Sequence, residues 1–138
     1  MMAQLEKTIQ RFAASDRQTR LELLLDYSKK LPPLPERLIP LRDQGINRVP
    51  EYQSPVFLFL ERENGGLVLH ADAPREAPTV RGFVSLLSKA VHGATAEQVS
   101  ELPGDILDQL GLAEALGMTR MHGLTAMVAR IKRMAREV

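Results

Sequence analysis

The spacing of apolar residues predicts two helices at the start of the chain. The first, over residues 3–14, has an apolar stripe formed by Leu5, Ile9, Phe12 and Ala13. A capping box predicts where the second begins, because the Ser15 hydroxyl is placed to accept the Gln18 backbone N–H while the Gln18 side chain reaches back. The inward stripe of the second helix is predicted to be Leu21, Leu24, Leu25 and Ser28. Pro32 ends it, since proline has no N–H to donate and disfavours helix at the preceding residue.

Two short apolar runs in the middle of the chain predict a β-hairpin. Residues 56–60 are apolar without alternation, residues 67–70 form the second run, and Asn64 with Gly65 lies in the turn between them. Residues 44–49 are predicted to pair with the hairpin as a third strand. Three strands are about the smallest sheet that is stable when helices cover one face.

Further helices are predicted in the second half of the chain. Pro78 suits the first turn of a helix, where its missing N–H has no consequence. Thr95 and Gln98 form a capping box that opens a short helix, and residues 105–110 predict another. The last helix is predicted over about residues 121–136. Its inward side chains are expected to be Leu124, Met127, Val128, Ile131 and Met134.

The expected fold class is therefore α+β: a small three-stranded antiparallel sheet packed with N-terminal and C-terminal helices, in a single domain over residues 1–138. A chain of 138 residues is long enough to bury a core of its own. The net charge of +1 gives no electrostatic reason to expect nucleic acid or an acidic membrane as a partner. No apolar run approaches the roughly 20 residues that span a bilayer. The first residues contain no apolar signal segment, so a cytoplasmic location is expected.

The sequence contains no cysteine, and this limits the chemistry that it can perform. Disulfides, thiolate-bound metals and thiol nucleophiles are all excluded for these residues. His70, His92 and His122 are too widely separated to form a local metal-binding motif. No cofactor and no metal are therefore expected.

Four segments resemble the SufE family and occur in that family's order. They are the break at residues 31–35 (LPPLP), the loop at 50–53 (PEYQ), the strand exit and helix entry at 71–82 (ADAPREAPTVRG), and the late segment at 119–127 (TRMHGLTAM). The resemblance covers nearly the whole chain, and it implies the α+β fold of that family.

This resemblance also implies a function, because SufE proteins are non-enzymatic sulfur acceptors and activators that work with cysteine desulfurases in iron–sulfur cluster assembly. In the family, a Pro-Glu-Cys-Gln loop presents the cysteine that accepts the persulfide sulfur. Tyr52 stands at the position of that cysteine. A phenol, with a reference pKa of about 10, cannot hold a mobile sulfur atom as a thiolate can. The chain is therefore expected to dock on a cysteine desulfurase without carrying persulfide itself.

The resemblance implies docking through Pro50, Glu51, Tyr52, Gln53, Ser54 and Arg120. Iron–sulfur scaffold proteins are further candidate partners. From the residue types alone, Tyr52 is expected to pack over the loop with its hydroxyl at the surface. Arg120 is expected to pair with Glu51 or to bond to a helix terminus.

Several interpretations of Tyr52 stay open at this point. The chain is either a family member that lost sulfur carriage and kept docking, or an active carrier whose cysteine has been replaced, and a packing role for Tyr52 is compatible with both. The genomic codon at position 52 distinguishes the first two. A small-molecule binding module on the same fold is a further alternative.

Overall fold

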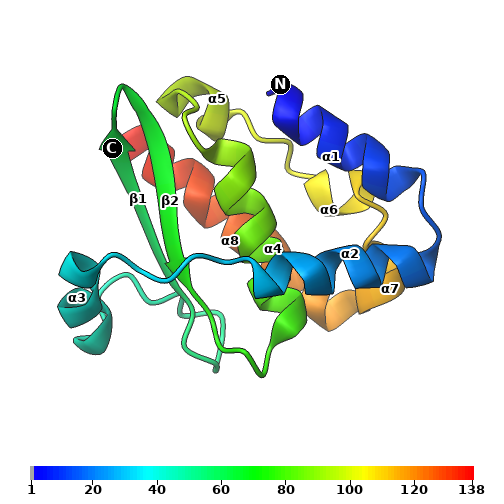
Figure 1. The fold of residues 1–138 in the computed structure, drawn as a ribbon, viewed down its shortest axis with the longest axis horizontal. Helices are drawn as coiled ribbons and strands as arrows, with labels where there is room; N and C mark the ends of the chain where they lie inside the picture. Colours follow the sequence, from blue (N-terminus) through cyan, green and yellow to red (C-terminus); the bar gives the residue numbers. More distant parts are fainter. Residues whose placement is uncertain (1) are drawn as a thin grey trace.

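The computed structural model describes residues 2–138, in which helices pack against a single β-hairpin. In chain order the elements are α1 (Ala3–Ala13), α2 (Arg17–Lys29), η1 (Glu36–Leu38), α3 (Ile39–Asp43), β1 (Phe57–Glu63), β2 (Gly66–Asp72), α4 (Pro78–Val91), α5 (Ala96–Ser100), α6 (Ile106–Gln109), α7 (Ala113–Leu116) and α8 (Met118–Glu137). The hairpin lies at one side of the molecule, α4 and α8 pack behind it, and α1, α6 and α7 lie on the far side (Figure 1). The α+β class is as predicted.

The predicted hairpin is confirmed. Strands β1 and β2 pair antiparallel from Phe57 opposite Asp72 to Glu63 opposite Gly66. The turn consists of Asn64 and Gly65, whose φ angles of 52° and 83° lie in the left-handed region. Two such residues make the hairpin turn whose twist matches that of the flanking strands.

The prediction of a third strand over residues 44–49 is wrong, because the sheet of the described chain has two strands. Gly45 and Asn47 have φ angles of 80° and 61°, which an extended strand does not use. The chain turns as it leaves α3 and touches the sheet only through an isolated bridge between Arg48 and Phe57. The outer edge of β1 is therefore paired only at its start.

The two faces of the hairpin are buried against different parts of the chain. One face packs on the main core with Leu58, Leu60, Leu67, Leu69 and Ala71. The other face presents Phe57 and Phe59, which pack with Leu34 and Leu38 of the proline-rich segment. Burial on both faces explains why residues 56–60 are apolar without alternation.

Helix α4 ties the hairpin to α2. A Cβ built on Gly82 would lie 2.2 Å from the Leu24 carbonyl oxygen, so only glycine permits this helix contact. Next to it, the Arg81 side chain is buried, and its Nε donates to the Ser28 carbonyl at 2.9 Å. A second guanidinium nitrogen of Arg81 donates to the Ala73 carbonyl at 2.5 Å. These bonds join the end of α2, the exit of β2 and the start of α4.

The helix caps agree only in part with expectation. At α2 the cap is Asp16, whose carboxylate accepts the Thr19 N–H at 2.8 Å, so the capping box predicted at Ser15 is wrong. An anionic side chain is favoured at this position because it also complements the helix dipole. At α5 the predicted capping box of Thr95 and Gln98 is confirmed.

Helix α8 begins three residues earlier than predicted and underlies the hairpin. Its inward residues Leu124, Met127, Val128 and Ile131 are buried as expected, and Met134 is half-buried. In α2, Leu24 and Ser28 are buried, but Leu25 is 41% exposed, so its predicted inward position is wrong. No helix within residues 2–138 is long and apolar enough to cross a membrane.

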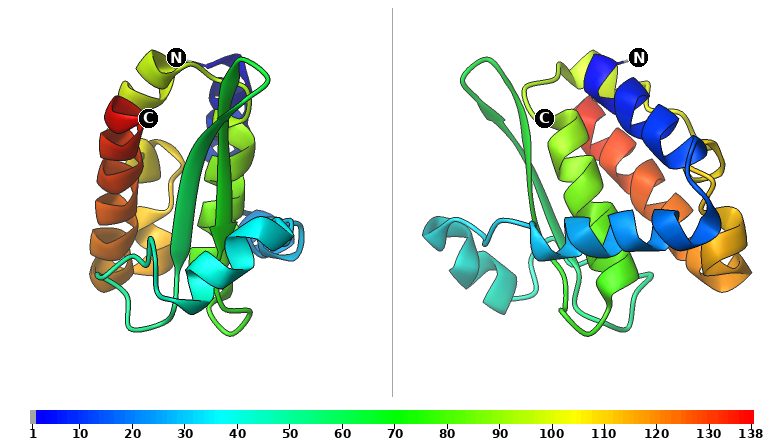
Figure 2. Two further views of the ribbon diagram at one scale, coloured as in Figure 1. Left: turned by 90° about the vertical axis from the view of Figure 1, so that its left-hand side faces the viewer. Right: turned by 45° about the vertical axis from the view of Figure 1, so that its right-hand side comes forward.

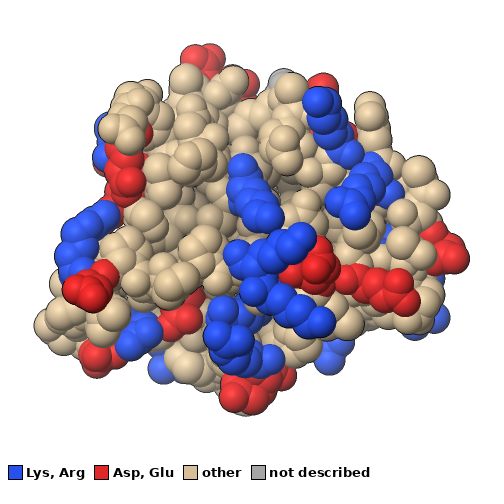
Figure 3. All heavy atoms as spheres, viewed as in Figure 1, with Lys and Arg blue, Asp and Glu red and all other residues tan. Residues whose placement is uncertain are grey.

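Two further views show how β1 and α8 are placed. With the left-hand side of the molecule facing the viewer, α8 runs along one side of the hairpin and α3 lies in front of its lower part (Figure 2). On the face seen in Figure 1, acidic and basic side chains are interspersed, with a group of basic side chains near the centre (Figure 3).

Candidate functional site

Residues 50–55 form an exposed loop that is fixed at its base. The Val49 N–H donates to the Val56 carbonyl at 2.8 Å, and both valines are fully buried. Within the loop, the Tyr52 N–H donates to the Val49 carbonyl at 3.3 Å, which makes a turn. The Arg48 guanidinium donates to the Gln53 carbonyl at 2.6 Å. The base is thus anchored in the core while the tip faces solvent.

Tyr52 rests on α8 at a glycine. A Cβ built on Gly123 would lie 2.9 Å from the Tyr52 hydroxyl oxygen and 3.1 Å from two ring carbons, so a side chain at position 123 would collide with the ring. Tyr52 is half-buried and packs against the main core, as predicted. Its hydroxyl is not at the surface, however. The oxygen is buried and has no hydrogen-bond partner within residues 2–138.

Burial controls the electrostatics of the loop. It raises the pKa of the Tyr52 phenol well above its usual value, and the neighbouring Glu51 carboxylate adds to the rise. Tyr52 is therefore a neutral side chain at physiological pH. Glu51 pairs with Arg130 at 3.4 Å and not with Arg120, so the first of the two interactions expected for Arg120 is wrong. Glu51 thus reaches a later turn of α8 than the one that carries Arg120, which sequence spacing does not reveal.

The loop and the start of α8 line a cavity of about 700 Å³ that is open to solvent. It is lined by Glu51, Tyr52, Gln53, Ser54, Val80, Thr119, Arg120, His122, Gly123 and Ala126. Five of the six predicted docking residues are thus brought together, and the sixth, Pro50, is exposed beside the cavity without lining it. Arg120 is exposed and makes no hydrogen bond or ion pair within the described chain.

Sequence reasoning did not place several contributors at the site, among them Gly123 under the Tyr52 ring and His122. Val80 of α4 and Thr119 and Ala126 of α8 line the cavity, and Arg130 holds Glu51. Val80, Thr119 and Ala126 lie in segments that resemble the family, but their residue types do not mark them as lining a cavity. Their role follows only from the contact of the loop with α8.

The chemistry available in the cavity is recognition and not covalent catalysis by a thiol. No residue of the sequence carries a thiol, and the buried phenol of Tyr52 stays protonated. Arg120 and His122 offer donors at the rim, and Glu51 and Ser54 offer acceptors. Such a mixed polar rim around an aromatic side chain is typical of a protein-binding surface.

A second cluster of polar side chains lies away from this cavity. The ligand atoms of Glu61, Glu63 and His70 lie within 4.8 Å of one another, a spacing that a metal ion could bridge. Arg37 already pairs with both glutamates, and His70 Nε2 lies 2.6 Å from a Glu63 oxygen. A metal would have to displace the guanidinium. We therefore interpret the cluster as an ion-pair network that ties η1 to the hairpin.

Comparison with known proteins identifies the family of the chain. Residues 6–135 match the SufE family, described as the Fe-S metabolism associated domain. The chain therefore belongs to the SufE family, as its motifs indicated. Its sequence is 40% identical over 136 residues to an uncharacterized SufE-like protein of Mycobacterium tuberculosis, covering 98% of this chain and 93% of the relative.

Two other relatives are informative. The sulfur acceptor protein CsdE of Escherichia coli is 31% identical over 106 residues, which cover 75% of this chain and 68% of that protein. A solution structure of a hypothetical protein from Thermus thermophilus matches with a TM-score of 0.84 and 31% identity, covering 99% of this chain and 96% of that one. This chain, a SufE protein, differs from the family's loop pattern in having tyrosine in place of the expected cysteine.

Proposed function

We propose that this chain docks on a cysteine desulfurase through the 50–55 loop and Arg120, and that it affects the desulfurase without carrying sulfur. Two findings support a role next to sulfur transfer: membership of a family described by Fe-S metabolism, and a relative named as a sulfur acceptor. One observation carries the proposal. Tyr52, at the loop position where the family has its cysteine, is uncharged and packs on α8, while the residues around it are polar and exposed.

The loss of sulfur carriage follows from the chemistry of the side chain. Persulfide transfer requires a thiolate that attacks the terminal sulfur and later releases it. The Tyr52 oxygen is protonated, and its hydroxyl is buried against Gly123. A nucleophile for persulfide transfer must be deprotonated and accessible to the desulfurase, and the Tyr52 oxygen is neither.

Retention of docking is supported by what stays exposed. Glu51, Gln53 and Ser54 present polar groups at the loop tip, while the base is held by Val49 and Val56. A loop that is already ordered loses little conformational entropy on binding. Arg120 stands beside it, and arginine is enriched among the residues that dominate protein interfaces.

Calorimetric titration of the cognate cysteine desulfurase with the chain tests this proposal. We expect Arg120→Glu to weaken binding by about tenfold or more, which corresponds to about 1.4 kcal/mol or more. Arg133→Glu is the matched control, because it makes the same charge change on an exposed residue of α8 that does not line the cavity. Equal losses for both variants, or no binding of the unaltered chain at micromolar concentration, would contradict docking through this site.

The proposal extends to setting and partners. Iron–sulfur scaffold proteins are candidate further partners, and the cytoplasm is the proposed location. Both follow from the family and not from any contact in the fold. Sulfide release by the desulfurase, measured with and without the chain, reports whether docking changes its activity.

A further inference from the structure

The outer edge of β1 is unpaired beyond its first residues. In an antiparallel pair, alternate residues direct both backbone groups toward the partner strand or away from it. The Leu58 N–H points outward, since it donates to the Asn47 carbonyl at 3.2 Å. Leu60 and Arg62 therefore also direct their N–H and C=O groups outward. No residue within 2–138 forms a backbone hydrogen bond to these outward groups of Leu60 or Arg62.

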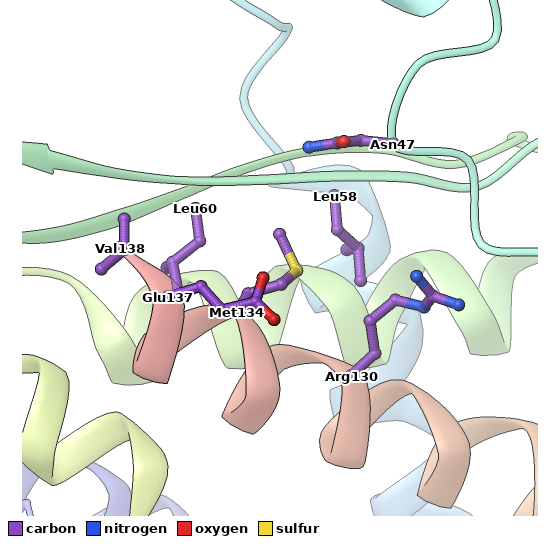
Figure 4. Close-up of a pocket in the computed structure, with 7 residues that line it drawn as sticks. All are labelled: Asn47, Leu58, Leu60, Arg130, Met134, Glu137 and Val138. Atoms are coloured by element: carbon purple, nitrogen blue, oxygen red, sulfur yellow. The ribbon is translucent and has the colours of Figure 1, made fainter.

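A groove runs along this open edge, between β1 and α8. Its volume is about 330 Å³. The strand side is formed by Asn47, Leu58 and Leu60, and the helix side by Arg130, Met134 and Glu137. In Figure 4 the leucines and Met134 point toward one another across the groove, and Arg130 extends upward at one end. Helix α8 thus lies under the place that a third strand would occupy.

One end of the groove has an unused hydrogen-bond donor. The Arg130 Nε is buried and has no hydrogen-bond partner in the described chain. A different nitrogen of the same guanidinium makes the long 3.4 Å contacts with Glu51. A buried donor without an acceptor costs about 1–3 kcal/mol, so an oxygen supplied by a ligand would be stabilising there. The opposite end carries the exposed carboxylate of Glu137.

We propose that an extended segment of a partner protein binds in this groove as a third strand beside β1. Its backbone pairs with the outward groups of Leu60 and Arg62. An apolar side chain fills the space between Leu60 and Met134, and an acidic side chain two residues away pairs with Arg130. Because residues two apart share a face of a strand, one short segment meets both requirements. This surface adjoins the proposed desulfurase docking site, because Arg130 also pairs with Glu51 of the loop.

The groove does not fit a second copy of this chain. Residues of β1 that face α8 are Leu58, Leu60 and Arg62, since the first two belong to the main core and the third bonds to the carbonyl of Val138. An antiparallel copy of β1 keeps the same residues on this face. Of the β1 side chains on this face, it would bring Arg62 toward Arg130, which is a like-charge contact. A heterologous peptide with an acidic residue avoids this repulsion.

The test uses the full ¹⁵N-labelled chain and a blocked heptapeptide. The peptide has threonine at its odd positions and valine, glutamate and valine at its second, fourth and sixth positions, so that either strand direction presents the same face. We expect the amide signals of Leu60 and Arg62 to shift and to become protected from hydrogen exchange. A peptide with lysine in place of glutamate is expected to bind about tenfold more weakly or worse. Peptides N-methylated at alternate residues add a geometric check, because N-methylation removes backbone N–H donors. Only one of the two alternating sets of N–H groups faces β1, so only one of the two methylated peptides is expected to lose binding.

Variants of the chain test the contribution of Arg130 to the groove. Arg130→Gln is expected to abolish the difference between the glutamate and lysine peptides. Arg133→Gln, an exposed change on the same helix that does not line the groove, is expected to leave that difference intact. The proposal is overturned if neither peptide shifts Leu60 and Arg62 at about 1 mM. It is also overturned if both N-methylated sets bind equally, or if these amides change with protein concentration alone, which would indicate self-association.

Discussion

The contact between Tyr52 and Gly123 predicts that the effect of Gly123→Ala on the free energy of unfolding changes sign with the residue at position 52. Alanine is favoured over glycine inside a helix by about 1 kcal/mol, so Gly123→Ala alone should stabilise α8. The added Cβ would lie 2.9 Å from the Tyr52 hydroxyl, short of the 3.4 Å at which ordinary contacts begin. Inserting a methyl group into a packed contact typically costs about 1–3 kcal/mol. In the unaltered chain we therefore expect Gly123→Ala to lower the free energy of unfolding by about 0–2 kcal/mol.

With Tyr52 replaced by alanine, the collision disappears and only the helical preference remains. Gly123→Ala should then raise the free energy of unfolding by about 1 kcal/mol, giving a coupling energy of about 1–3 kcal/mol between the two positions. Urea unfolding followed by far-ultraviolet circular dichroism measures all four proteins, and equal m values confirm that the transitions are comparable. Thr125→Ala, an exposed change on the same helix, should show no coupling to Tyr52. If Gly123→Ala changed the free energy of unfolding equally in both backgrounds, the packing of Tyr52 against α8 at Gly123 would be refuted.

Four further predictions concern the buried Tyr52 hydroxyl and the buried contacts of α4. Tyr52→Phe removes an unpaired buried hydroxyl and should stabilise the chain by about 1 kcal/mol in urea unfolding. Because the folded state raises the pKa of Tyr52, its contribution to stability is complete below about pH 10 and is lost as the pH rises further, so alkaline titration should destabilise the unaltered chain more than Tyr52→Phe. Gly82→Ala should lower the free energy of unfolding by more than about 2 kcal/mol, since its Cβ would lie 2.2 Å from the backbone oxygen of Leu24. A smaller loss in urea unfolding would refute the tight helix contact. Arg81→Leu leaves two carbonyls without donors and should cost about 2–4 kcal/mol, whereas the exposed Arg75→Leu should change stability by less than about 0.5 kcal/mol.

The local pattern predicted the elements whose stability is local. The apolar spacing along α8, the capping box at Thr95 and the Asn64-Gly65 turn all depend on neighbours within a few residues, and each is found. In α1, Leu5 and Phe12 are buried as predicted, but Ala13 is exposed, so its predicted place in the apolar stripe is wrong. The cap of α2 was assigned one residue too early, because Ser15 and Asp16 both suit a cap and the carboxylate at the second position is preferred.

Features that depend on distant contacts were not predictable in the same way. Residues 44–49 have a sequence compatible with a strand, but Gly45 and Asn47 take left-handed conformations as the chain leaves α3. Likewise the choice of Arg130 over Arg120 as the partner of Glu51 depends on how the loop lies along α8. Periodicity alone did not mark the 50–55 loop as functional. Its resemblance to the loop of a known family did so.

Persulfide transfer to position 52 tests the central claim most directly. Tyr52→Cys and, as the matched control, Tyr27→Cys are each incubated with a persulfide-loaded cysteine desulfurase, and the intact masses are measured. In the transfer, the thiolate takes the terminal sulfur, the desulfurase cysteine leaves as a thiolate, and no external reductant or oxidant is needed. We predict a gain of one sulfur atom for Tyr52→Cys, and none for Tyr27→Cys or the unaltered chain. Sulfur bound covalently to the unaltered chain, or equal loading of both cysteine variants, would contradict a docking loop that has lost its carrier residue.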